Sequence, residues 1–173
     1  MKTHRTPAML WLLTGLAACS APPARDSHQV SASQTVADSA FAGVQHRGHV
    51  AMRVDQYTST HHFEPTPDGG LITLERDVKD SAGVAQIRHH MLQIAAAFQR
   101  GDFAIPGFVH DRPVPGTEIM TARRAHISYR PDTLARGGAL RISSQDPEAV
   151  TAIHQFLAFQ RRDHRVPDAE NSQ

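Results

Sequence analysis

Hydrophobic and polar residues follow the same order in two stretches of this chain, a β-hairpin pattern and then a helix pattern. In each stretch, two strand-like segments flank a turn rich in Pro and Gly, and a helix-like segment follows. The strand, strand and helix segments are residues 57–63, 71–76 and 82–100 in the first stretch and residues 126–130, 139–144 and 147–162 in the second. Because hairpins with one apolar face need a cover, we predict an α+β domain of duplicated hairpin-helix (ββαββα) units, a four-stranded antiparallel sheet with two helices on one face.

Alternation within the hairpins predicts which strand residues face the helices. The inward positions of the second hairpin are expected to be Ile127, Tyr129, Leu140 and Ile142. If Phe63 takes the place of Tyr129 in the first hairpin, His61 faces inward and His62 faces outward. A further strand is expected at Val50, Met52 and Val54.

Both helical segments carry an apolar stripe at steps of three and four residues. The first stripe consists of Val84, Ile87, Met91, Ile94 and Phe98. His90 lies about a quarter-turn from its centre, so this side chain reaches the edge of the core, whereas His89 points to solvent.

The second helix has a clear start, with Asp146 at the N-cap and Pro147 at the first helical position. Its stripe is Val150, Ile153 and Leu157. His154 falls inside this stripe, so we expect it to be at least partly buried. Phe156 and Phe159 fall outside it and are expected to be exposed residues for a protein partner or a homodimer.

Residues 101–124 form a long connection between the two units, and such connections often hold a short helix or a binding site. His110 and Asp111 lie here among prolines, and residues 117–124 have the pattern of one or two helical turns. The two side chains are candidates for metal binding or catalysis. The equally favoured alternative is that they are ordinary polar residues of a solvated loop.

The chain begins with an apolar run over residues 9–16, preceded by Lys2 and Arg5 and followed by Cys19. The string LAAC over residues 16–19 resembles a bacterial lipoprotein signal, with an ordinary secretory signal as the alternative. The resemblance implies that residues 1–18 are removed and that Cys19 is acylated, which gives a firm membrane anchor. Ser20, rather than Asp, favours the outer membrane, with the protein facing the periplasm.

Composition divides the remaining chain into three parts. Residues 19–45 are rich in Ser, Ala, Pro and Gln and are expected to form a flexible tether. Residues 46–165 are expected to form the single domain, and residues 166–173 a disordered tail.

Charge and cysteine content exclude several classes of function. The chain has 18 Lys and Arg against 17 Asp and Glu, and the loss of Lys2 and Arg5 keeps it near neutral. This balance provides no basic surface for nucleic acid. Because Cys19 is the only cysteine, disulfides, thiolate metal ligands and cysteine nucleophiles are excluded.

The 12 histidines are the candidate chemistry of this protein. We expect His61, His90, His110 and His154 to converge between sheet and helices as a site for Cu or Zn. Met91 would favour Cu(I) in this site. The residues expected to surround the metal ligands are Asp111, His62 and His164. For His154 the alternative is a core imidazole bound to a backbone carbonyl or a carboxylate.

Five strings carry a wider resemblance, HHF, IRHHMLQIAAAFQRGDF, VHDRPVPGTEIM, GGALRI and AIHQFLAFQRRDH. Together they resemble a family of small exported bacterial proteins that are mostly uncharacterised. The resemblance covers residues 46–164 and singles out His61, His62, His90, His110, His154 and His164. It implies a histidine site, without an established activity.

Three functions remain open from the sequence. The first is a membrane-anchored envelope lipoprotein that binds a transition metal through clustered histidines. The second is a non-catalytic structural or protein-interaction lipoprotein. The third is a small enzyme based on His and Asp, which is the least favoured, because standard catalytic signatures such as G-x-S-x-G and H-E-x-x-H are absent from the sequence.

Overall fold

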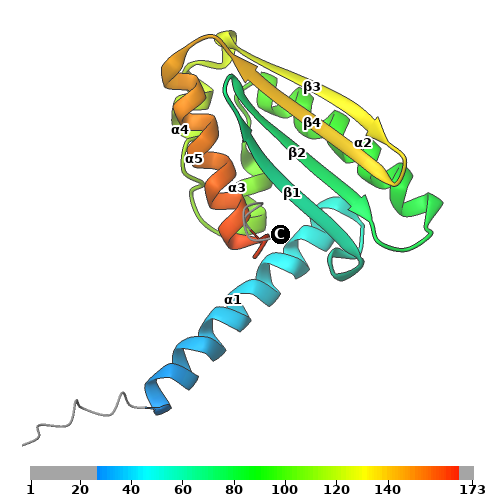
Figure 1. Cartoon of the computed structure of the whole chain (residues 1–173), viewed down its shortest axis with the longest axis vertical. Helices are drawn as coiled ribbons and strands as arrows, with labels where there is room; N and C mark the ends of the chain where they lie inside the picture. Colours follow the sequence, from blue (N-terminus) through cyan, green and yellow to red (C-terminus); the bar gives the residue numbers. More distant parts are fainter. Residues whose placement is uncertain (1–26, 168–173) are drawn as a thin grey trace, which may run out of the picture.

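The structure, a computed structural model, describes residues 27–167, with side chains from Gln34 onward. Four antiparallel strands form one sheet in the order β1-β2-β4-β3 (Figure 1). Their bounds are β1 Ser59–Thr66, β2 Gly69–Arg76, β3 Ile127–Leu134 and β4 Gly137–Ser144. Helix α2 follows the first hairpin and helix α5 follows the second, so the α+β fold of duplicated hairpin-helix units is confirmed.

The two hairpins are tighter than the sequence suggested. Thr66 pairs with Gly69, and Leu134 pairs with Gly137, so each turn has only two residues between the strands. The Gly-Gly pairs therefore lie inside β2 and β4 rather than in the turns. A Cβ atom at Gly137 would lie 1.9 Å from the carbonyl oxygen of Leu74, which explains why glycine is needed at this strand position.

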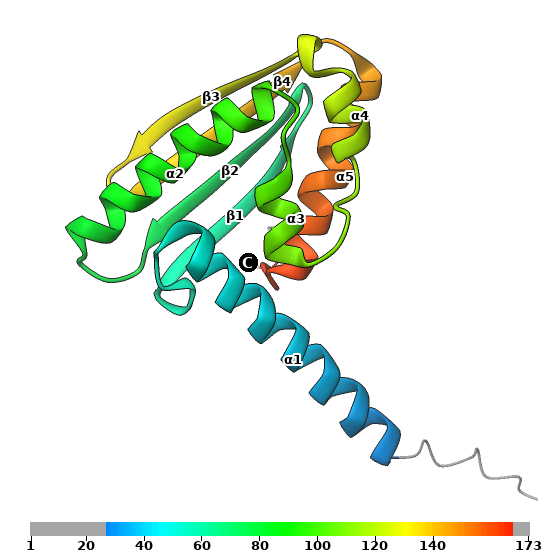
Figure 2. The ribbon, with the colours of Figure 1, turned by 180° about the vertical axis from the view of Figure 1, so that it is seen from behind.

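Helices α2 (Ser81–Gln99) and α5 (Pro147–Asp163) pack on different halves of the sheet. Helix α2 contacts mainly β3 and β4, and α5 contacts mainly β1 and β2 (Figure 2). Both helices begin with an aspartate cap, in which Asp80 accepts from the amide of Gly83 and Asp146 accepts from the amide of Glu148, both at 2.9 Å. The predicted start of the second helix at Asp146 and Pro147 is confirmed.

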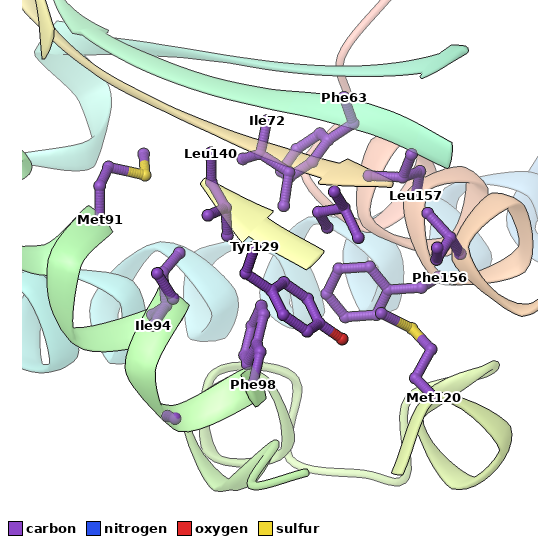
Figure 3. Close-up of a cluster of buried hydrophobic side chains, with 14 of the residues drawn as sticks. Phe63, Ile72, Met91, Ile94, Phe98, Met120, Tyr129, Leu140, Phe156 and Leu157 are labelled. Atoms are coloured by element: carbon purple, nitrogen blue, oxygen red, sulfur yellow. The ribbon is translucent and has the colours of Figure 1, made fainter. Parts of the chain in front are cut away.

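One hydrophobic core fills the space between sheet and helices (Figure 3). The ring of Phe98 from α2 is its centre, with ring centroids 5.8 Å from Tyr129 and 6.0 Å from Phe156. The strand residues that alternation placed inward are all buried, namely Phe63, Ile127, Tyr129, Leu140 and Ile142.

The expectation that Phe156 and Phe159 are exposed is wrong. Phe156 is 1% exposed and Phe159 is 8% exposed, because residues of the connection between the two units cover this side of α5. Phe103 packs edge-on against Phe156, and His110 packs edge-on against Phe159.

That connection holds three short helices, α3 (Ala104–His110), α4 (Thr117–Ala122) and the 3-10 helix η2 (Arg124–His126). The helical turns expected over residues 117–124 are confirmed. Helix α3 was not predicted, since Pro106 and Gly107 usually break helices. Pro106 is the third residue of α3, where its missing N–H costs no hydrogen bond.

Helix α1 (Ser27–Met52) replaces most of the flexible tether expected over residues 19–45. Its last turns belong to the fold, because Val44 and Gln45 are buried and the Nε atom of Arg47 donates to the carbonyl of Val109 at 2.8 Å. Its earlier turns project away from the domain (Figures 1 and 2). Cys19 and the signal lie outside the described residues.

The strand expected at Val50, Met52 and Val54 is not formed. Val50 and Met52 belong to the last turn of α1, and Val54 is buried in the link to the 3-10 helix η1 (Gln56–Thr58). Within residues 27–167, no helix is both long and apolar enough to span a membrane.

Candidate functional site

A cavity of about 70 Å³ lies where β1 and β2 meet the helices. By the usual scale for buried water, this volume holds a few water molecules or one small ligand. Its wall is mainly apolar and comes from the sheet, α2, α3, α5 and the end of α1; Met91, Ile94 and Phe98 face Phe63 and Ile72 across the core beside it (Figure 3). The polar side chains in the wall are His61, His90, His110, Gln160 and His164.

Three of the four histidines predicted to converge do line this cavity, namely His61, His90 and His110. Each comes from a different element, β1, α2 and α3 respectively. The fourth member is His164, the C-cap residue of α5, which the sequence predicts only for the surroundings of the site. The fold therefore brings together residues that are up to about a hundred positions apart in the sequence.

His154 does not belong to this site. Its Nε2 atom lies 2.9 Å from the carbonyl oxygen of Thr66, at the end of β1. The alternative interpretation, a partly buried imidazole bound to a backbone carbonyl, is the correct one. His62 is exposed on the opposite side of β1, as the alternation of β1 predicted.

His61, Phe63, His110 and His164 form a cluster of aromatic rings at one end of the cavity. The ring centroid of His164 lies 4.7 Å from that of His61 and 5.2 Å from that of His110. Phe63 stacks on His61 at 5.6 Å with the two ring planes nearly parallel. These contacts hold the imidazoles of His61 and His164 together without a hydrogen bond between them.

Burial keeps the imidazoles of His61, His90 and His164 neutral. Desolvation lowers the pKa of His61 to about 3, with smaller effects of His90, His62 and His110. Desolvation also lowers the pKa of His90 to about 4, helped by His89. The pKa of His164 lies well below its usual range, again mainly through burial, although Asp163 acts in the opposite direction.

The hydrogen bonds of these three rings are incomplete. The Nδ1 atom of His90 is buried and has no hydrogen-bond partner. Within residues 27–167, the rings of His61 and His164 likewise form no hydrogen bond. Because buried polar groups are nearly always paired, the free Nδ1 atom of His90 points to a bound ligand or water, and the half-buried rings of His61 and His164 are free to bind the same species.

His110 is different, since both of its ring nitrogens are occupied. Its Nδ1 atom donates to a carboxylate oxygen of Asp163, and its Nε2 atom lies 2.8 Å from the side-chain oxygen of Gln160. The other oxygen of Asp163 accepts from Arg112, whose guanidinium lies over the ring of Phe159. His110 thus has no free nitrogen for a ligand or for acid-base catalysis, and it ties α3 to the end of α5.

The sequence named Asp111 as the carboxylate beside His110, but the structure gives this role to Asp163. Asp111 is exposed and has a left-handed backbone (φ 54°), which ends α3. Asp163 lies 53 positions from His110. No local pattern connects residues so far apart, so only the folded chain reveals this pair.

The donor set of the cavity fits a soft or borderline metal ion. The thioethers of Met52 and Met91 line it together with the imidazoles, and no Asp or Glu is among the described residues of its wall. Within residues 27–167, no group of three or more His, Cys, Asp or Glu side chains is already arranged around one metal position. An ion would therefore require these side chains to turn toward it.

Comparisons with models of protein families, with curated proteins and with solved structures found no match to this chain. The functional argument therefore depends on the site itself.

Proposed function

We propose that this protein is a lipoprotein of the bacterial cell envelope, anchored through Cys19 in the outer membrane, and that its cavity binds a transition metal ion. The N-terminal string that ends at Cys19 supports the anchor. The observation that carries metal binding is the meeting of three imidazoles, His61, His90 and His164, in the wall of one cavity, where the buried Nδ1 atom of His90 has no hydrogen-bond partner.

A metal ion explains why polar rings are kept in an apolar wall. A buried imidazole without a partner costs free energy, which a hydrophobic residue of similar size would avoid. Metal binding requires the neutral ring, because the ion takes the lone pair of a ring nitrogen. At neutral pH, protons do not compete for these nitrogens, since burial holds the pKa of His61 at about 3 and that of His90 at about 4.

The choice of metal follows from the donors. Imidazole suits Cu and Zn, whereas hard ions such as Mg²⁺ and Ca²⁺ require the carboxylate oxygens that the described wall lacks. An ion bound at about 2.0–2.1 Å from each nitrogen would require the rings of His61 and His164 to turn from their present tilted contact, in which the ring planes meet at 34°.

The test uses the whole mature chain from residue 19, with Cys19→Ser to prevent acylation, because α1 is part of the fold. Titration calorimetry with Zn(II) and Cu(II), and chelator competition for Cu(I), are expected to show one saturable site at micromolar metal or below. His90→Leu should abolish or strongly weaken binding.

His154→Ala is the matched control, because its ring lies outside the cavity and should leave metal affinity unchanged. Absence of saturable binding by the unsubstituted chain would overturn the proposal. Equal loss of affinity in His154→Ala and His90→Leu would overturn the assignment of the site to this cavity.

A further inference from the structure

We propose that Met52 and His90 form a passage through which Cu(I) moves from the protein surface into the cavity. This inference rests on the metal binding proposed above and adds the oxidation state of the ion and its route. It starts from a groove between the end of α1 and α2. Met52, the last residue of α1, and the following Arg53 line one side, and Gln86, His89, His90 and Gln93 of α2 line the other.

Met52 and His90 border both the outer groove and the inner cavity. Each is only 7% exposed, so these two side chains are the wall that separates the two spaces. The Nδ1 atom of His90 has no hydrogen-bond partner, so this ring can change its partner without breaking an existing bond. His89, one residue earlier on α2, is exposed in the outer groove.

The donors along this line follow one another from the outer groove to the far wall of the cavity. An ion at the surface meets His89 first, then Met52 and His90 in the wall, and then His61 and His164 inside. Movement along the line is a series of ligand exchanges in which one donor replaces another. The charge and oxidation state of the ion do not change, and no bond within the protein is broken.

The thioether in the wall selects the ion. Methionine sulfur is a soft, neutral ligand that suits Cu(I), whereas Zn(II) in proteins is bound by imidazole, thiolate and carboxylate. No Asp or Glu lines this groove among the described residues, so a doubly charged ion finds little compensation there. Met52 therefore favours Cu(I) at the step where the ion leaves the surface.

The other hollows next to the cavity are poor routes for a cation. The hollow between α1 and the ends of α3 and α5 shares His110 with the cavity, but both nitrogens of His110 are already bonded. Among the described residues, its lining holds four arginines against two aspartates, whereas the outer groove holds one arginine, Arg53, so the excess of positive charge that repels a cation is larger here. The hollow near Pro65 shares only Phe63 with the cavity, and this residue offers no donor atom.

The experiment measures the rate of Cu(I) transfer from a Cu(I)-bicinchoninate complex to the mature chain by stopped-flow absorbance, beside the equilibrium affinity. Met52→Leu keeps the size of the side chain and removes the sulfur. We expect it to slow transfer by about tenfold or more, equivalent to about 1.4 kcal/mol in the barrier. His89→Ala should slow transfer while leaving the equilibrium affinity nearly unchanged.

Met120→Leu is the matched control, because Met120 is fully buried and lies outside the wall of the cavity and the groove. It should leave the transfer rate unchanged, and the thermal unfolding of each variant shows that it is folded. If the unsubstituted chain binds Cu(I) but Met52→Leu and His89→Ala transfer it at the same rate as that chain, the passage is wrong and the site stands. If the unsubstituted chain binds no metal, the proposed function itself fails.

Discussion

His90 is expected to contribute to metal binding while it lowers the free energy of unfolding of the metal-free protein. It is 7% exposed, lies beside the apolar stripe of α2, and leaves one ring nitrogen without a partner. Replacing such a group by an apolar one of similar size removes the desolvation cost. We therefore expect His90→Leu to raise the free energy of unfolding of the metal-free protein by about 1–3 kcal/mol, as measured by urea denaturation, while metal binding is lost.

His154→Leu is the comparison for this substitution, because the ring of His154 has a partner in the carbonyl of Thr66. Its loss should leave stability unchanged or lower it. A fall in stability for His90→Leu would contradict the interpretation of His90 as an unsatisfied residue kept for binding.

Asp163 and Arg112 form an ion pair in which the two side chains are expected to contribute differently to the free energy of unfolding. The side chain of Asp163 is 18% exposed and accepts from both His110 and Arg112, whereas that of Arg112 is 54% exposed. We expect Asp163→Asn to lower the free energy of unfolding by about 1–3 kcal/mol, since it weakens the two hydrogen bonds that the charged carboxylate accepts. Arg112→Ala should cost less than about 1 kcal/mol, as exposed ion pairs usually do.

Chemical denaturation at pH 7 measures both effects. Equal losses in the two variants would show that the His110 contact contributes nothing beyond a surface ion pair.

The contact between Asp163 and His110 also shows which side-chain contacts the sequence could not predict. Alternation along β1 was enough to place His61 inside and His62 outside, but the contact of Asp163 with His110 depends on how α3 and α5 meet.

Among the elements, β4 shows why its two neighbouring glycines are not equivalent. A Cβ at Gly137 would lie 1.9 Å from the backbone oxygen of Leu74, and one at Gly138 would lie 3.0 Å from the flexible side chain of Met91. We expect Gly137→Ala to separate β4 from β2 and to destabilise the protein severely, and Gly138→Ala to cost about 1 kcal/mol or less. Urea midpoints of the two variants test this, and similar midpoints would contradict it.

Helix α1 shows what composition alone misses. Residues 27–45 are rich in Ser, Ala and Gln, which suggested a tether, but Ala and Gln are also good helix formers. What makes the end of α1 part of the domain is tertiary contact, because Val44 is buried and Arg47 bonds to Val109 of α3. By contrast, the stripes of α2 and α5 were visible in the sequence, since the apolar positions of each recur at steps of three and four residues.

At the scale of the whole molecule, the duplication of hairpin and helix was enough to predict the sheet and helices α2 and α5. The cavity was not predictable in the same way, because its wall combines β1, α2, α3, α5 and the end of α1. Periodicity tells which side of an element is buried, but not where several buried sides leave a gap. For this reason His154 was a reasonable candidate from its stripe and yet lies elsewhere.

The neutral histidines also give the whole molecule a predictable response to acid. The unfolded chain takes up protons on His61, His90 and His164 near the usual histidine pKa of about 6.5, whereas in the folded chain burial lowers the pKa of His61 to about 3 and that of His90 to about 4. Between these pH values the unfolded state binds more protons, so the stability of the metal-free protein falls as pH decreases. Each such histidine contributes a slope of up to about 1.4 kcal/mol per pH unit.

Urea unfolding of the metal-free chain at several values between pH 7.5 and pH 4.5 measures this slope. His90→Leu removes one of the three titrating rings, so its stability should fall less steeply with decreasing pH than that of the unsubstituted chain. The gain in stability of His90→Leu should therefore grow as the solution becomes more acidic. Parallel curves for the two proteins would show that the folded state already protonates His90 near pH 6.5, and the ring would then not be held neutral by burial.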